Sequence, residues 1–154
     1  MLREAQFVDL PAIVHLYQQL TQEMAALAPD TYRPLTTDNR PYFADYLQND
    51  LARLFVTESQ GTLTGFALVV LARTGDSPEF VPQHFAQLID LFVTPDHRHH
   101  GLAKTLMTAV EAFAASHQAS FIQLNVLSGN QTAREVYARA GFQPVNLILQ
   151  KPLN

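Results

Sequence analysis

An apolar run from Leu88 to Val93, which ends at Pro95, constrains the fold more than any other part of the chain. Short, nearly continuous apolar runs are typical of a strand that is buried on both faces of a sheet. After a polar loop, apolar residues recur at helical spacing between Leu102 and Phe113. This segment therefore predicts a buried strand that leads directly into an amphipathic helix.

The rest of the chain supplies further elements in an alternating pattern. We expect strands over residues 2–7, 54–57, 63–71, 120–127 and 145–150, and helices from about 10 to 24, over 41–50 and over 133–140. Asp9 is the expected N-cap of the first helix. At 154 residues, the chain predicts one domain over 1–154. The predicted class is α/β, with a mixed, mostly antiparallel central sheet and helices on both faces.

Net charge and the lack of cysteine narrow the functional classes. The net charge is −4, whereas a nucleic-acid-binding domain normally carries a basic patch. Without a thiol, the chain can form neither a cysteine zinc site nor an acyl-cysteine intermediate. The longest apolar run, 65–72, is too short to cross a bilayer, and the first residues do not resemble a signal peptide. We expect a cytoplasmic protein with no nucleic-acid or membrane partner.

The loop and helix start between Arg98 and Lys104 predict an anion site. The first N–H groups of a helix have no partner within it, and the helix dipole favours negative charge there. Gly101 and Ala103 are small enough for a phosphate group to approach, and Arg98 and Lys104 could add charge-assisted hydrogen bonds. The alternative is that Gly101 only eases the loop into the helix and Ala103 only packs against the sheet.

A second group of candidate residues lies about thirty positions later. Asn130 and Tyr137 are seven residues apart, so they lie about two turns apart on one helix face. Gly141, followed by Phe142, stands where a left-handed C-cap is expected. Each residue also has an ordinary interpretation, because Asn130 could be an N-cap and Tyr137 a half-buried aromatic residue.

Three histidines flank Arg98 and raise the question of a metal site. His97, His99 and His100 lie on one tight loop, where three side chains rarely converge on one ion, and no His-Glu-x-x-His spacing follows. We expect no metal. Partly protonated His99 or His100 could instead contribute to phosphate binding.

In this order and spacing, the two groups resemble the acetyl-CoA site of the GNAT superfamily of N-acetyltransferases. The resemblance rests on Val93, Pro95, Arg98-x-x-Gly101-x-Ala103, Asn130, Ala133, Tyr137, Gly141 and Phe142. Residues 2–13 also resemble the first strand and helix of that family. The resemblance implies the GNAT acyltransferase fold, acetyl-CoA as co-substrate and an amine as acceptor. Because relatives are often dimers, it also implies a possible homodimer.

The resemblance further implies roles for particular residues. The backbone of Leu91, Phe92 and Val93 would pair with the pantetheine arm of the cofactor. The pyrophosphate would be held by the amides of His99, His100, Gly101, Leu102, Ala103 and Lys104. The Asn130 side chain would reach the cofactor. Tyr137 would face the thioester sulfur and protonate the departing thiolate as general acid.

The residue that removes the acceptor's proton is less apparent. Where some members of the family carry a glutamate, this chain has Asn125 or Ile89. The neighbouring Asp90 is the remaining candidate base. An unpaired carboxylate in an apolar run is costly, so it is hydrogen-bonded, hydrated in a cleft or shifted in pKa. The alternatives are a structural carboxylate bonded to nearby backbone, and proton removal through a chain of water molecules.

The function expected from these residues is direct transfer of the acetyl group to a primary amine of a small molecule or peptide. Acidic residues over 21–50 and 74–83 favour a cationic acceptor, although such charges can also be a solvated face. One alternative is a non-catalytic acyl-CoA-binding regulatory domain, because the glutamates are missing. Another is a partner-binding module with no CoA site.

Overall fold

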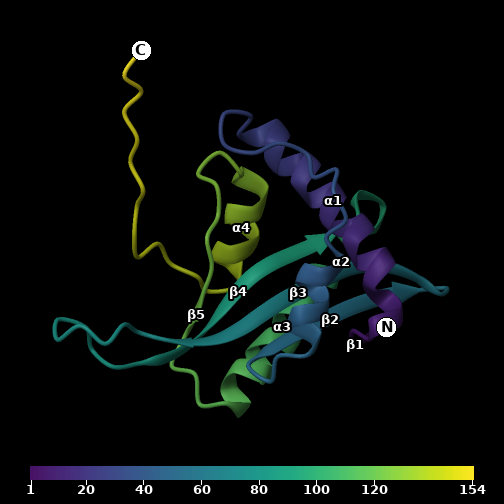
Figure 1. The fold of residues 1–154 in the computed structure, drawn as a ribbon, viewed down its shortest axis with the longest axis horizontal. Coiled ribbons are helices and arrows are strands. Elements are labelled where there is room, and N and C mark those ends of the chain that lie inside the picture. The colour runs from purple at the N-terminus through teal and green to yellow at the C-terminus, as the bar shows by residue number, and fades with distance from the viewer.

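A five-stranded sheet runs through the molecule in the order β1-β2-β3-β4-β5 (Figure 1). The computed structural model describes residues 1–154. The strands are β1 Leu2–Glu4, β2 Ala52–Ser59, β3 Thr62–Arg73, β4 His84–Val93 and β5 Ile122–Gln123. The first four pair antiparallel, and β5 pairs parallel with β4. The predicted mixed, mostly antiparallel sheet is therefore confirmed.

Helices cover both faces of this sheet, as predicted. The helices are α1 Leu10–Leu27, α2 Arg40–Leu47, α3 Leu102–Ser116 and α4 Gln131–Arg139, with 3-10 turns at Phe7–Asp9 and Pro95–His97. One core cluster joins α1 and α2 to the first face of the sheet, and another joins α3 to the second. Residues of α4 pack against the edge of the α3 cluster. None of these helices is long and apolar enough to cross a membrane.

Alternation along the strands explains why the chain needs two helical layers. On β2, Leu54 and Val56 face α1 and α2, whereas Phe55 faces α3. On β3, Leu68 and Val69 divide in the same way. Because successive side chains of a strand point to opposite faces, a strand that is apolar at every position must be covered twice.

Asp9 is in the predicted place but not in the predicted role. It precedes α1, yet its side chain makes no capping hydrogen bond to that helix. The carboxylate instead accepts hydrogen bonds from the Arg3 guanidinium at 2.7 and 2.9 Å and from the Gln6 amide at 2.8 Å. A bidentate guanidinium–carboxylate pair is stronger than an ordinary cap, and it joins β1 to the start of α1.

Two strand predictions are wrong, and both concern the same edge of the sheet. The strand expected over 120–127 is reduced to Ile122–Gln123, because β4 and β5 pair only there and then separate. Residues 145–150 form no strand, since no other strand lies beside them. A smaller difference is that β4 begins at His84 rather than Leu88, because its pairing with β3 continues to that residue.

Candidate active site

The separation of β5 leaves part of β4 with an unpaired edge. The Thr94 amide donates to the Thr64 carbonyl on β3 at 2.9 Å. Because backbone groups alternate along a strand, the amides of Leu91 and Val93 point away from β3, into the space that β5 has left. Phe92, which the sequence placed with these two, directs its amide to β3 instead.

A row of free backbone donors begins at His99, six residues after Val93. No backbone or side-chain group accepts a hydrogen bond from any of the six amides between His99 and Lys104. The first hydrogen bond of α3 joins the Thr105 amide to the Gly101 carbonyl at 3.0 Å. These donors are the unpaired groups that the start of a helix leaves, together with those of the preceding loop.

The loop conformation leaves this row open. Gly101 has a φ of 82°, in the left-handed region that glycine adopts without strain, and a Cβ added there would meet no atom within 4 Å. His99 is also left-handed, with a φ of 64°. Successive amides in such conformations form concave anion-binding surfaces. The loop is therefore shaped to receive a negatively charged group.

Arg98 does not lie among the free donors. Its Nε donates to the Val93 carbonyl at 2.8 Å, and another guanidinium nitrogen lies 2.6 Å from a Glu23 carboxylate oxygen. The guanidinium carbon lies 5.4 Å from the centre of the Phe92 ring. These contacts tie α1, the end of β4 and the loop together, so the Arg98 side chain holds the loop in place.

Asp90 is half-buried, and its carboxylate makes no hydrogen bond. Its Oδ2 is inaccessible to solvent and unbonded, so the interpretation of a structural carboxylate bonded to nearby backbone is wrong. It lies opposite Leu68, and therefore on the sheet face that α1 and α2 cover. Burial raises the pKa of Asp90 to about 6, because desolvation penalises the charged form.

Three tyrosines from three helices lie within range of the charge of this carboxylate. Burial and, after it, the negative charge of Asp90 raise the pKa of Tyr17 on α1 and of Tyr137 on α4, the latter to about 12. Burial likewise raises the pKa of Tyr42 on α2, with a smaller contribution from Asp90. The rings of Tyr17 and Tyr42 are stacked, with centroids 6.3 Å apart. All three phenols are therefore neutral at physiological pH.

Asn130 has the ordinary role that its position allows. Its Oδ1 accepts a hydrogen bond from the Ala133 amide at 3.1 Å and so caps α4. The side-chain NH₂ group remains as a donor. In the same helix, the Tyr137 ring packs edge-on against Phe142, with centroids 5.8 Å apart.

The loop histidines do not form a metal cluster. His97 is held by Thr94, with 2.9 Å between Nδ1 and Oγ1. No group of three or more His, Cys, Asp or Glu side chains comes together anywhere in the structure in a way that could hold an ion.

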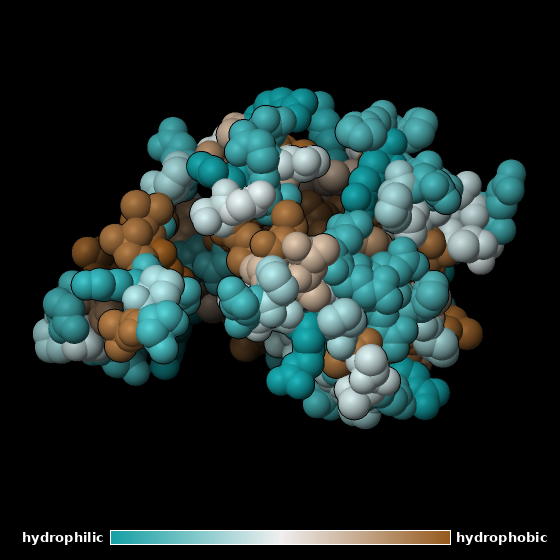
Figure 2. Space-filling model, turned by 90° about the horizontal axis from the view of Figure 1, so that it is seen from above, coloured by the Kyte–Doolittle hydropathy of each residue, from teal (hydrophilic) through white to brown (hydrophobic).

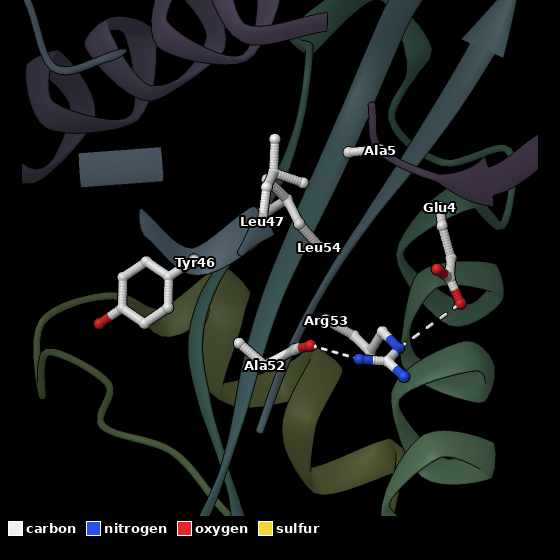
Figure 3. A pocket seen from close by; sticks show the side chains of 7 residues that line it. All are labelled: Glu4, Ala5, Tyr46, Leu47, Ala52, Arg53 and Leu54. Atoms are coloured by element: carbon white, nitrogen blue, oxygen red, sulfur yellow. Dashed lines mark hydrogen bonds and ion pairs between the residues drawn. The ribbon is translucent and has the colours of Figure 1, made fainter. Parts of the chain in front are cut away.

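A small pocket at the start of β2 is separate from these residues. Figure 3 shows Glu4, Arg53 and Tyr46 around it, together with four small or aliphatic side chains. Arg53 lies 3.6 Å from Glu4 and donates to the Ala52 carbonyl at 2.8 Å. Because none of the residues predicted for the site lines this pocket, it does not belong to the candidate active site.

The fold and the loop geometry together define an acyl-CoA N-acyltransferase architecture. The chain belongs to the acetyltransferase (GNAT) family, whose sequence model matches residues 15–142. The resemblance drawn from the sequence is thereby confirmed.

A curated relative is also described as an N-acetyltransferase. An uncharacterized N-acetyltransferase, YycN of Bacillus subtilis (strain 168), is 33% identical over 72 residues, which are 47% of this chain and 46% of that protein. The match thus spans about half the length of this curated relative.

Solved structures share the fold over the whole chain. A mutant of the BH1408 protein from Bacillus halodurans has a TM-score of 0.93 at 20% identity, covering 100% of this chain and 99% of that one. The aminoglycoside N-acetyltransferase AAC(6')-Iy in complex with CoA has a TM-score of 0.76 at 19% identity, covering 100% and 99%. The same enzyme is also known in complex with a bisubstrate analogue, CoA-S-monomethyl-acetylneamine.

Sequence reasoning missed Tyr17 and Tyr42. Each stands on the apolar face of its own amphipathic helix and packs against the core. In the sequence they are therefore indistinguishable from ordinary core residues. The only available signal was their polar phenol groups, which gain significance once Asp90 is known to face α1 and α2.

Proposed function

We propose that this chain is an acetyl-CoA-dependent N-acetyltransferase that passes the acetyl group directly to a primary amine. The proposal rests mainly on the row of six unbonded amides at the start of α3, beside the unpaired edge of β4. Such donors, together with the helix dipole, suit the two phosphates of a pyrophosphate. The Leu91 and Val93 backbone would pair with pantetheine as an added strand does. That AAC(6')-Iy, which has the same fold, binds CoA supports acetyl-CoA as the co-substrate.

Asp90 is the proposed base. A carboxylate with a pKa of about 6 is mostly ionised at neutral pH, and no hydrogen bond within the protein occupies the carboxylate of Asp90. An ammonium acceptor gives one proton to Asp90, and the freed lone pair attacks the thioester carbonyl carbon. The carbonyl oxygen becomes negative in the tetrahedral intermediate, where the Val93 amide at the unpaired edge is the candidate donor.

Tyr137 is the proposed general acid. When the tetrahedral intermediate collapses, the C–S bond breaks and the electron pair leaves with sulfur. The Tyr137 hydroxyl, kept neutral by a pKa of about 12, gives its proton to that thiolate. The acetylated nitrogen still holds one proton more than an amide has, and the Tyr137 phenolate takes it, so that the products are the amide, the free thiol of CoA and the proton held by Asp90. Because Asp90 and Tyr137 lie near enough for the charge of one to affect the other, both proton transfers are assigned to one site.

The acceptor is proposed to be cationic before it reacts. Tyr17 and Tyr42 offer aromatic faces beside a buried carboxylate, a combination that favours an ammonium group. A small polyamine, an amino sugar or a peptide N-terminus would satisfy this chemistry.

Thiol release from acetyl-CoA tests this proposal. We expect CoA to appear when the protein meets an active member of a panel of polyamines, amino acids, aminoglycosides and free peptide N-termini. Calorimetry with acetyl-CoA alone separates the alternatives. Binding without turnover over the panel would support the regulatory domain, and no binding would remove the CoA site altogether.

A further inference from the structure

The end of β4 carries two backbone groups of Val93 that point the same way. In an antiparallel strand, the N–H and C=O of one residue lie on the same side, so both groups of Val93 point away from β3. The N–H has no partner in the structure, whereas the C=O accepts a hydrogen bond from the Arg98 Nε at 2.8 Å. At this residue, therefore, only the donor is free.

Glu23 on α1 holds the Arg98 guanidinium against this carbonyl. A second guanidinium nitrogen lies 2.6 Å from a Glu23 carboxylate oxygen, and the guanidinium carbon lies 5.4 Å from the centre of the Phe92 ring. Figure 1 shows the end of β4 beside α1, which brings together two residues that are 75 positions apart in the chain. The planar fork of an arginine can bond a carbonyl and a carboxylate at the same time in a fixed geometry.

The charge of Arg98 is balanced within the protein. Arg98 directly precedes the row of free amides, where an unpaired guanidinium would bind phosphate. Because the Glu23 carboxylate neutralises it, the pair adds no net charge to the anion site. The contacts of Arg98 therefore fix the Val93 carbonyl rather than a phosphate group.

Apolar surroundings increase the effect of this carbonyl on nearby charge. Val93 is buried, and the separation of β4 and β5 is flanked by the partly exposed apolar side chains of Ile89 and Val126. Figure 2, a view from above, shows hydrophobic surface near the middle of the molecule, inside a hydrophilic rim. Polar groups act more strongly on one another where little water is present. A bare carbonyl oxygen here would therefore repel negative charge that forms beside the Val93 amide.

We propose that Arg98, held by Glu23, is a positioning residue for acyl transfer: it masks the Val93 carbonyl, so that only the Val93 N–H faces the reacting thioester. The inference rests on the proposed function, in which the Val93 amide stabilises the negative oxygen of the tetrahedral intermediate. An unmasked carbonyl oxygen on the same side would oppose that stabilisation. Because this negative charge is absent from bound acetyl-CoA, masking acts on turnover and not on the affinity for the co-substrate.

Two double variants test the masking while keeping the pair of residues neutral. Glu23→Gln/Arg98→Gln retains a donor, because the Gln Nε2 stands as far along the side chain as the Arg Nε. Glu23→Gln/Arg98→Met has a side chain of similar length without a donor. We expect kcat of the methionine variant to be about 10-fold lower than that of the glutamine variant, the effect of one lost hydrogen bond. Calorimetry without acceptor should give both variants the same affinity for acetyl-CoA.

The outcomes separate this inference from the function on which it rests. Equal kcat in the two double variants, beside an active parent, would overturn the masking and leave the proposed function intact. A methionine variant that loses acetyl-CoA affinity and kcat in the same proportion would show that Arg98 only holds the loop, and would also overturn it. A parent protein that releases no thiol with any acceptor would remove the proposed function, and the masking with it.

The single variant Glu23→Gln gives a second test that does not depend on how the double variants fold. It frees the guanidinium, which can then turn from the carbonyl to the pyrophosphate. We expect acetyl-CoA to bind about 2- to 5-fold more tightly, the range of a solvent-screened charge pair, while kcat falls. The matched control Glu111→Gln, at an exposed position of α3, should keep both parent values. A Glu23→Gln variant with weaker acetyl-CoA binding, or with the parent kcat, would contradict the proposal.

Discussion

Asp90 on β4 lies directly opposite Leu68 on β3, and the pairing then slips by one residue so that Ile89 has no partner. This bulge reverses which face of the sheet the side chains of β4 point to. Leu88 packs in the α3 cluster, whereas Phe92, an even number of residues away, packs in the α1 and α2 cluster. Without the extra residue, Asp90 would share the face of Leu88. Bulges often re-aim a side chain at a functional site, and this one turns Asp90 toward Tyr17 and Tyr42.

The first prediction concerns catalysis by Asp90. If the carboxylate accepts the acceptor's proton, kcat/KM rises with pH through about 6, because Asp90 must be ionised. Asp90→Asn should lower turnover by about 10²-fold or more and should remove this limb of the pH profile. The measurement is the initial rate of thiol release between pH 5 and 8. A variant that keeps the parent profile would assign the base to another group.

The second prediction concerns stability, which should fall with rising pH, whereas activity should rise. The pKa of Asp90 is raised from 3.8 to about 6 in the folded state, so the folded protein binds this proton more tightly than the unfolded chain does. Stability contributed by protonated Asp90 is therefore lost as the pH rises from about 4 to above 6. At ~1.4 kcal/mol per pKa unit, the loss is about 3 kcal/mol.

Asp90→Asn removes this titration. Urea unfolding should show the free energy of unfolding of the variant rising relative to that of the parent by about 2.5 kcal/mol between pH 4 and pH 7.5, which is most of this difference. If the free energy of unfolding depends on pH equally in the two proteins, folding does not raise the pKa of Asp90, and the prediction is wrong. Together, the two predictions describe a residue that costs stability and supports catalysis.

The third prediction concerns Tyr137. Tyr137→Phe removes the hydroxyl that protonates the thiolate while keeping the ring beside Phe142. We expect turnover to fall by about 10- to 100-fold, on the scale of general acid catalysis. The affinity for acetyl-CoA, measured by calorimetry without acceptor, should not change. Unchanged turnover on a good acceptor would remove Tyr137 from the mechanism.

The fourth prediction removes one donor from the row of free amides. Ala103 is the second residue of α3, and the chain already tolerates proline at this position in α1 and α2, as Pro11 and Pro41. Ala103→Pro should therefore keep the helix and lose one N–H. A hydrogen bond to a charged group is worth about 1.5–3 kcal/mol, so acetyl-CoA should bind about 10- to 100-fold more weakly.

Ala103→Val is the matched control for that experiment. It adds similar bulk and retains the amide, so any loss caused by bulk is shared by both variants, and Ala103→Pro should bind acetyl-CoA more weakly than Ala103→Val. Equal losses in both variants would trace the effect to bulk rather than to the missing donor.

The strand–loop–helix segment could be predicted from the sequence because its determinants are local. The apolar run that ends before Pro95 and the helical spacing after it do not depend on distant residues. The apolar residues at helical spacing between Leu102 and Phe113 lie within α3, which begins at Leu102. The small Gly101 in the loop indicated an anion site by the same local reasoning.

Other features could not be predicted because they depend on distant partners. The bulge at Ile89 cannot be predicted from the sequence, because the run from Leu88 to Val93 is apolar at almost every position and so shows no alternation that an extra residue would interrupt. The ion pair of Arg98 with Glu23 could not be predicted, because the two residues lie 75 positions apart in the chain. The pattern over 145–150 suits a strand, but a strand also needs a neighbour, and none lies beside this segment.

The most direct test of the central claim is the response of the α3 amides to CoA in a ¹⁵N–¹H correlation spectrum. Hydrogen bonds from these donors to pyrophosphate oxygens should move the signals of residues 99–104 more than any others, and downfield. CoA binding that leaves these six signals in place would contradict the account.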